Sequence, residues 1–459
     1  MDKKGKTRET RLYHSLISVV TMVVIMFVSI VGFGLTPQVP LVFGCFVAGV
    51  VSFIIGYNWE EILEGMISGI VNSLEAILIL LLIGMLVGSW IASGTVPALI
   101  YYGLKIVSPA IFLPATMIIC MIVSLAIGAW GTVGTIGLAF MGIGLALKMP
   151  APLVAGCVIS GSYLGDVVSP LSDATNLTAA VVHGDVFAIV KKVLPVSVAV
   201  AVFSVICYAI VGTKYAGGEM GSDIPVLSES LASQFNISPV AIIPLAVMVL
   251  CIALKMPAIP SMFLGSVAGM IIAVFYQGSS IGDAFGYAFS GYVSETGNEL
   301  IDNLLTAGGM EGMLESISII IIAMSFGGLM KATKQMEVLV KPIIIRIKNL
   351  GSMNFITVLT CIFMNIILPD QYLGISMPGA MYADEYKKRG FSNIALSAGL
   401  LGAAITSPLI PWNTCGIYCM TFVSASPLEY APYAFFCWML PIATILVGFI
   451  GSRRKSEKA

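Results

Sequence analysis

The segment Glu75-Ala-Ile-Leu-Ile-Leu-Leu-Leu-Ile-Gly84 places one carboxylate ahead of an apolar run that continues without a charged residue to Ala92. Such a run is close to the roughly 20 residues that a helix needs to cross the hydrocarbon core of a bilayer. The segment Glu315-Ser-Ile-Ser-Ile-Ile-Ile-Ile-Ala-Met324 repeats the pattern 315 − 75 = 240 residues later. The sequence therefore predicts a membrane-spanning helix of the same kind in each half of the chain.

The rest of the chain has the same apolar character. Of 459 residues, 58% are hydrophobic and 10% are charged, whereas soluble globular proteins carry about 25% charged residues. Further apolar runs lie at 16–33, 39–56, 111–127, 193–211, 237–254, 258–276, 316–330, 354–368 and 434–450. We therefore expect an all-α polytopic membrane protein. The net charge of −1 gives no basic surface for nucleic acid.

Other short matches follow the same order in both halves. Gly134 matches Gly374 at the offset of 240, and Ser169-Pro-Leu matches Ser407-Pro-Leu at 407 − 169 = 238. An ordered series of matches indicates an internal repeat. It predicts a first membrane repeat at 1–212, with a basic tail at 1–13, and a second at 237–450. A linker at 213–236 and a basic tail at 451–459 complete the chain.

The charges of corresponding loops indicate that the two repeats are inverted. Lys and Arg gather in short cytoplasmic loops, and the basic N-terminus places residue 1 inside. Lys105 stands alone after the first-half helix, whereas its second-half counterpart carries Lys331, Lys334, Lys341, Arg346 and Lys348. Corresponding loops thus fall on opposite faces, with both termini cytoplasmic and the linker extracytoplasmic. This is the inverted-topology design of secondary transporters, whose binding site lies near the midplane between the halves.

Two polar segments interrupt the apolar pattern at corresponding positions. The first is Gly161-Ser-Tyr-Leu-Gly-Asp-Val-Val-Ser-Pro-Leu-Ser-Asp-Ala-Thr-Asn176, and the second is Thr406-Ser-Pro-Leu-Ile-Pro-Trp-Asn-Thr414. Proline deletes a backbone donor and does not fit an unbroken helix without cost. We expect broken helices here, with re-entrant hairpins around 128–135 and 368–374. Irregular backbone at membrane depth is tolerated only where it is buried in protein or lines a cavity.

The polar side chains of these segments are candidates for binding an ion or a substrate. A carboxylate within the membrane costs about 2.5–3.5 kcal/mol on insertion scales and is a functional candidate by default. It can bind Na⁺ when ionised and a proton when neutral, so one site can exchange the two ions. The predicted binding residues are Asp166, Ser169, Ser172, Asp173, Thr175, Asn176, Ser407, Trp412, Asn413 and Thr414, with Na⁺ at Asp166, Asp173 and Asn176. Predicted coupling residues are Thr132, Thr135, Asp370 and Gln371.

Structural interpretations compete with these assignments. Asp173 could cap a half-helix, and Pro369-Asp370 could mark a turn at the membrane edge. Glu75 and Glu315 stand at helix starts, where they would face water or favour the N-terminal dipole. We expect a structural role for both glutamates.

The segments 161–176, 369–372 and 406–414 resemble the signature of NhaC-type sodium/proton antiporters of the ion transporter superfamily. The resemblance extends over nearly the whole chain. It implies Na⁺/H⁺ exchange by alternating access at a prokaryotic inner membrane, no cofactor, inverted repeats with re-entrant hairpins, and often a homodimer. Relatives that exchange malate and lactate, or amino acids, keep a small organic ion open as an alternative cargo.

Other function classes fit less well. A channel needs an open pore with several weak sites, which polar breaks in an inverted repeat do not suggest. The sequence contains neither a G-x-x-x-x-G-K-[ST] phosphate loop nor a His-Glu-x-x-His zinc motif. We therefore expect a transporter driven by ion gradients and not an enzyme.

Overall fold

A computed structural model describes residues 9–106, 108–215, 224–254, 256–295, 297, 302, 305–344, 349–368 and 370–456. Pro369, Arg346, Lys348, residues 216–223 of the predicted linker, and the outer parts of the two predicted tails (1–8 and 457–459) lie outside the described residues. In the described part, eight helices are long and apolar enough to cross a membrane, or up to eleven if each bent pair of helices is one span. The predicted all-α polytopic fold is confirmed.

Among the described residues of the first half there are ten α-helices. They are α1 (Leu12–Phe27), α2 (Gln38–Ile55), α3 (Trp59–Asn72), α4 (Leu74–Ala92), α5 (Thr95–Ile106), α6 (Pro109–Thr132), α7 (Leu138–Ala146), α8 (Ala151–Val168), α9 (Asp173–Val182) and α10 (Val186–Thr213). One π-helical segment, η1 (Val28–Gly32), extends α1, and another, η2 (Val133–Gly137), joins α6 to α7.

The second half repeats this order. Its α-helices are α11 (Ile224–Gln234), α12 (Ile243–Ala253), α13 (Ala258–Phe275), α14 (Ile281–Ser290), α16 (Leu314–Ala332), α17 (Gln335–Ile344), α18 (Leu350–Ile367), α19 (Gln371–Lys388), α20 (Asn393–Ala404), α21 (Thr414–Val423), α22 (Pro427–Tyr430) and α23 (Phe435–Ser456). Short 3-10 turns lie at η4 (Pro239–Ile242), η5 (Glu311–Met313), η6 (Ser407–Leu409) and η7 (Ala431–Tyr433). The predicted linker thus contains α11.

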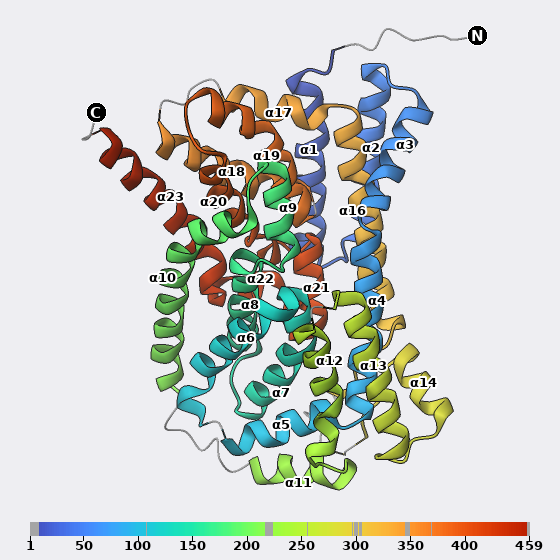
Figure 1. Cartoon of the computed structure of the whole chain (residues 1–459). Coiled ribbons are helices and arrows are strands. Elements are labelled where there is room, and N and C mark those ends of the chain that lie inside the picture. Colours follow the sequence, from blue (N-terminus) through green and yellow to red (C-terminus); the bar gives the residue numbers. More distant parts are fainter. Residues whose placement is uncertain are drawn as a thin grey trace.

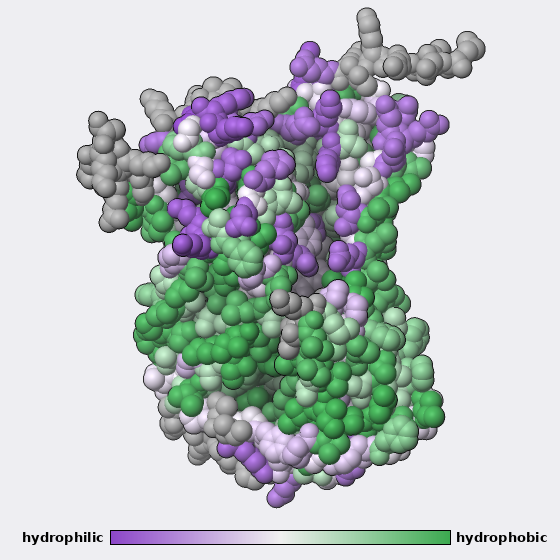
Figure 2. Space-filling view, viewed as in Figure 1, coloured by the Kyte–Doolittle hydropathy of each residue, from purple (hydrophilic) through white to green (hydrophobic). Residues whose placement is uncertain are grey.

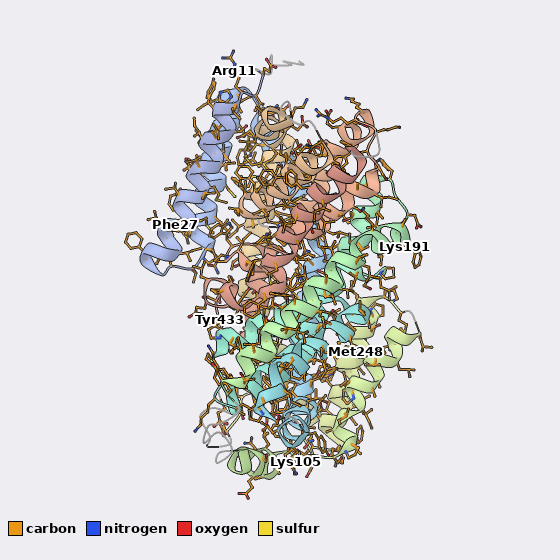
Figure 3. All side chains as sticks on the ribbon, turned by 90° about the vertical axis from the view of Figure 1, so that its left-hand side faces the viewer. Arg11, Phe27, Lys105, Lys191, Met248 and Tyr433 are labelled. Carbon is orange, nitrogen blue, oxygen red and sulfur yellow. The ribbon has the colours of Figure 1, made fainter. Side chains whose placement is uncertain are left out.

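Corresponding helices lie at opposite ends of the molecule. Helices α4 and α16 each have 19 residues and begin 314 − 74 = 240 residues apart. In Figure 1, α3 and α17 lie at the upper end, whereas their counterparts α14 and α5 lie at the lower end. Figure 3 places Lys105, in the first-half helix α5, at the end of the molecule away from Arg11 at the start of α1. This arrangement is the inverted repeat that the loop charges predict.

Each half packs its long apolar helix against the other half. Helix α16 packs on α2 and α3, and α4 packs on α13 and α14. The crossings are close because they are made by glycines: Gly69 on α3 faces Gly328 on α16, and Gly88 on α4 faces the backbone of Tyr287 on α14. Small residues allow this close approach of helix backbones within a membrane.

The outer surface matches a lipid environment. Large apolar side chains point outward, among them Phe46 and Phe53 on α2, Ile122 on α6, and Phe203 and Ile210 on α10. Figure 2 shows a broad hydrophobic belt on this face, with hydrophilic residues gathered at the upper end. The chain is therefore a multi-pass membrane protein.

Candidate functional site

Both predicted polar segments break helices. Helix α8 ends at Val168, Ser169 is extended, and α9 begins at Asp173. In the second half α20 ends at Ala404, the 3-10 turn Ser407–Leu409 follows, and α21 begins at Thr414 with a bend of 49°. The breaks therefore leave half-helix ends inside the protein.

A second pair of breaks faces the first. Helix α6 is interrupted at Gly128, whose φ of 72° and ψ of 176° are not helical. At the same place in the second repeat, 368 − 128 = 240 residues later, Leu368 is extended after the end of α18. A positive φ at this depth favours glycine, because a Cβ there would be strained. Whether these segments form re-entrant hairpins stays a prediction.

The breaks of the first half and elements of the second half surround one cavity of about 630 Å³. Four carboxylates line it: Glu75, Asp166, Asp173 and Asp370. The other polar and aromatic lining residues are Asn72, Ser73, Trp130, Ser169, Ser172, Asn176, Ser261 and Tyr372. The described lining holds no Lys, Arg or His. The four carboxylates give the described part of the lining an acidic character, which attracts cations.

Asp166 lies deepest among the first-half carboxylates, with 9% of its surface exposed. Its Oδ1 accepts hydrogen bonds from the backbone N–H of Ala129 and from Ser172 Oγ, both at 3.3 Å. The Thr175 hydroxyl donates to the Asp166 carbonyl at 2.9 Å. The carboxylate is thus oriented from both breaks of its own half.

Asp173 stands in the first turn of α9, where Ser172 is the N-cap and makes no side-chain capping bond. Its carboxylate lies within electrostatic reach of both Asp166 and Glu75. Because the structure gives Asp173 a place in the cavity wall, the alternative role as a helix cap is not needed to explain it. Asn176 also lines the cavity and donates to the carbonyls of Pro170 and Ser172, both at 2.9 Å.

Asp370 is both a helix cap and a cavity residue. It is the N-cap of α19 and accepts from the Leu373 N–H at 2.9 Å, and it is also one of the cavity carboxylates. Its side chain is 5% exposed and lies beside the Thr414 hydroxyl. The second repeat therefore contributes a carboxylate to the same cavity.

Four predicted second-half residues lie behind the cavity and not in its lining: Ser407, Trp412, Asn413 and Thr414. Trp412 Nε1 donates to the carbonyl of Ile366 at 2.6 Å, and Asn413 Nδ2 donates to that of Asn365 at 3.0 Å. These bonds satisfy the last carbonyls of α18, which have no partner within the helix. The hydroxyls of Ser407 and Thr414 are buried and have no hydrogen-bond partner among the described residues.

The remaining predicted residues are buried next to the cavity. The hydroxyls of Thr132 and Thr135 donate to the carbonyls of Gly128 at 2.8 Å and Gly131 at 2.6 Å. Gln371 accepts from Cys415 Sγ at 3.0 Å, while its Nε2 has no partner among the described residues. Thr132 and Thr135 thus support the break from behind, whereas the Gln371 side chain lies beside the Asp166 carboxylate.

Glu75 lines the cavity, although the sequence favoured a structural role over a gate or coupling role for both Glu75 and Glu315. Glu75 stands in the first turn of α4, as expected for a helix start. This turn forms part of the cavity wall opposite Asp173, so Glu75 faces the cavity. Its repeat partner Glu315 accepts from Gln38 Nε2 at 3.3 Å and does not line the cavity. A single carboxylate directly ahead of an apolar run was the sequence signal, and both glutamates share it.

Known proteins resemble the chain over most of its length. Residues 161–452 match the Na⁺/H⁺ antiporter family. Relatives that are 34% identical are the malate-2H⁺/Na⁺-lactate antiporter of Bacillus subtilis (90% of this chain, 89% of that one), the arginine/ornithine antiporter ArcD of Halobacterium salinarum (95% and 92%) and the Na⁺/H⁺ antiporter NhaC of Alkalihalophilus pseudofirmus (98% and 97%). A solved structure of Neisseria gonorrhoeae MtrF aligns over 96% of each chain with a TM-score of 0.43 and 13% identity.

The matched region begins at Gly161, at the start of the first polar segment, and includes both helix breaks of the second repeat. The relatives align along nearly their whole length, so the likeness is not confined to one motif. The chain belongs to the Na⁺/H⁺ antiporter family.

Proposed function

We propose that the protein exchanges Na⁺ for H⁺ across the membrane by alternating access, with Asp166 holding either ion. The observation that carries this proposal is a cavity lined by four carboxylates and, among the described residues, by no basic side chain. An ionised carboxylate binds the metal cation and a neutral one carries the proton, so the two ions exclude each other. As a member of an antiporter family the protein is a transporter, and the exchange needs no cofactor.

Oxygen atoms near Asp166 would complete a sodium site. Ser172, Asp173 and Asn176 supply oxygens on the cavity wall. The last residues of α6 before Gly128 also line the cavity, and the carbonyl end of a helix favours a cation. Hard cations prefer oxygen ligands of this kind. Ser169 donates to the Leu125 carbonyl at 2.8 Å and so positions the end of this half-helix.

The second repeat would couple the two ions through Asp370. The Thr414 hydroxyl lies beside this carboxylate, and the Ser407 hydroxyl is buried in the same break without a hydrogen-bond partner among the described residues. Buried polar atoms without a protein partner are available to a bound water or ion. In this proposal Trp412 and Asn413 keep the break open by holding the end of α18, and Gln371, Thr132 and Thr135 hold the walls.

We further infer that both termini face the cytoplasm of a prokaryotic cell and that the protein lies in its inner membrane. The positive-inside rule supports this orientation, because Lys331 in the last turn of α16 and Lys334 directly before α17 lie at the same end of the molecule as the start of α1. Residues 1–212 and 237–450 would form the two repeats around the linker at 213–236. The homodimer and specific contacts with membrane lipid stay predictions.

An organic cation is the second candidate cargo. A cavity of about 630 Å³ is far larger than one sodium ion, and Trp130 and Tyr372 in its wall could face an ammonium or guanidinium group. The arginine/ornithine relative is consistent with this cargo. The malate/lactate type of exchange is less favoured, because a dicarboxylate would meet four acidic side chains in the cavity wall.

Transport assays in proteoliposomes with an internal pH dye would test the cargo. We expect Na⁺ alone to move protons against an imposed pH gradient, and malate or lactate to add nothing. Arginine or ornithine would replace Na⁺ if the second candidate is correct. Proton movement that requires malate or lactate would contradict both cation proposals.

Glu75→Gln is expected to raise the Na⁺ concentration that gives half-maximal exchange by about twofold to fivefold, with little change in the maximal rate. The reason is that Glu75 attracts cations into the cavity opposite Asp173 but, being exposed, is screened by water. Initial rates over a range of Na⁺ concentrations would measure the effect. Glu315→Gln is the matched control, since Glu315 stands at the corresponding helix start outside the cavity; an equal change in both variants would reject the role of Glu75.

A further inference from the structure

The segment that holds Asp166 is itself held by a residue of the second repeat. Gly128 interrupts α6, so the peptides around it lack regular helical hydrogen bonds. Ala129 and Trp130 follow directly and line the cavity. A break of this kind keeps its shape only if other groups satisfy and fix its backbone.

Tyr418 on α21 supplies that contact. Its hydroxyl donates to the carbonyl of Trp130 at 2.5 Å, and its ring stacks on the Trp130 ring with 4.6 Å between centroids and 10° between planes. Tyr418 is fully buried and does not line the cavity. Gly134 leaves room for it, because a Cβ at that position would lie 2.6 Å from the Tyr418 hydroxyl.

Trp130, which Tyr418 contacts, is the chain neighbour of Ala129, which donates to Asp166. The Ala129 N–H that donates to Asp166 Oδ1 belongs to the residue directly before Trp130. Fixing the Trp130 carbonyl and ring therefore limits how far the Ala129 amide can turn away from the carboxylate. The Thr132 hydroxyl also supports the break by donating to the Gly128 carbonyl, but this contact lies within α6 and does not involve the second repeat.

We propose that Tyr418 is a positioning residue that sets the ion affinity of Asp166 and links this site to α21 of the second repeat. The proposal rests on the proposed function of Asp166 and adds a residue from the opposite half to its control. A shift of α21 would move the Trp130 carbonyl and ring together. The Ala129 donor would then move away from Asp166.

Tyr418→Phe tests the role, because it removes the hydroxyl and keeps a ring for stacking. We expect the half-saturating Na⁺ concentration for exchange to rise about tenfold, as the loss of one buried hydrogen bond predicts. The maximal rate should change much less, since Asp166 itself is intact. Measured Na⁺ binding to the purified full-length protein should weaken by the same factor.

Tyr208→Phe is the matched control. Tyr208 is also fully buried, and its hydroxyl donates to the carbonyl of Tyr433 at 2.5 Å, away from the cavity lining. Tyr208→Phe loses this bond and a second one with Ser160 Oγ at 2.9 Å, so its thermal stability should fall at least as much as that of Tyr418→Phe, while only Tyr418→Phe loses Na⁺ affinity. An unchanged affinity in Tyr418→Phe, or an equal loss in Tyr208→Phe, would overturn the positioning role. Neither result would touch the role of Asp166, which Asp166→Asn tests separately.

Discussion

Asp166→Asn is expected to abolish Na⁺-driven proton movement, lowering the initial rate in dye-loaded proteoliposomes at least about a hundredfold. The amide has nearly the same shape as the carboxylate, so the Ala129 and Ser172 contacts can be kept in part. It carries no charge for Na⁺ and cannot take up or release a proton. Charge-assisted contacts are roughly twice as strong as neutral ones, and the loss of the exchangeable proton removes the second half of the cycle.

Asp185→Asn is the control for this prediction. Asp185 caps α10 by accepting from the Ala188 N–H at 2.8 Å, and it does not line the cavity. Asn caps helices as well as Asp does, so transport and stability should be unchanged. If Asp166→Asn exchanges at the normal rate while Asp173→Asn does not, the ion is held by Asp173 instead. Full activity in both variants would remove the basis of the proposed function.

The helices and their order could be predicted because a long apolar run is stable only where it is shielded from water. A run without charge, such as that after Glu75, can be buried only in lipid or in the protein. The internal offset of 240 residues then predicted that α4 and α16 are corresponding helices of the two repeats. The loop charges predicted that the two lie in opposite orientation, and the positions of α5 at the lower end and α17 at the upper end of the molecule agree with it (Figure 1).

The sequence could predict where the helices break, but it could not predict which way the side chains at the breaks point. Gly, Pro and carboxylates in one segment predicted an interrupted helix around Asp166, because such residues are costly within lipid. Trp412 and Asn413 have the same polar character, yet they turn toward the open carbonyls at the end of α18. That choice depends on where α18 ends in space, and this is set by packing between segments about 50 residues apart.

The roles of Glu75 and Tyr418 could not be predicted from the sequence either, because they depend on contacts between distant segments. Glu75 and Glu315 share one sequence pattern, and only the position of α4 beside the cavity separates them. Tyr418 lies in an apolar stretch of α21 with no motif of its own. Its contact with Trp130 joins residues 288 positions apart, and no local pattern encodes a pair at that separation.

The crossing of α3 and α16 leads to the prediction with the largest effect on folding. A Cβ added at Gly69 would lie 2.0 Å from the carbonyl oxygen of Met324 and 3.0 Å from the Cα of Gly328. These are backbone atoms, so no flexible side chain can move aside. Gly69→Ala should therefore force the two helices apart and destabilise the protein by about 3 kcal/mol or more.

Thermal unfolding of detergent-solubilised protein, followed by the loss of monodisperse material in size-exclusion chromatography, would measure this effect. Gly49→Ala is the matched control, because Gly49 lies within α2 and a Cβ there meets no atom within 4 Å. That variant should be as stable as the parent protein, since Ala is favoured over Gly in a helix. Equal stability of Gly69→Ala and Gly49→Ala would mean that α3 and α16 can separate freely, and that the close crossing between the two repeats does not hold them together.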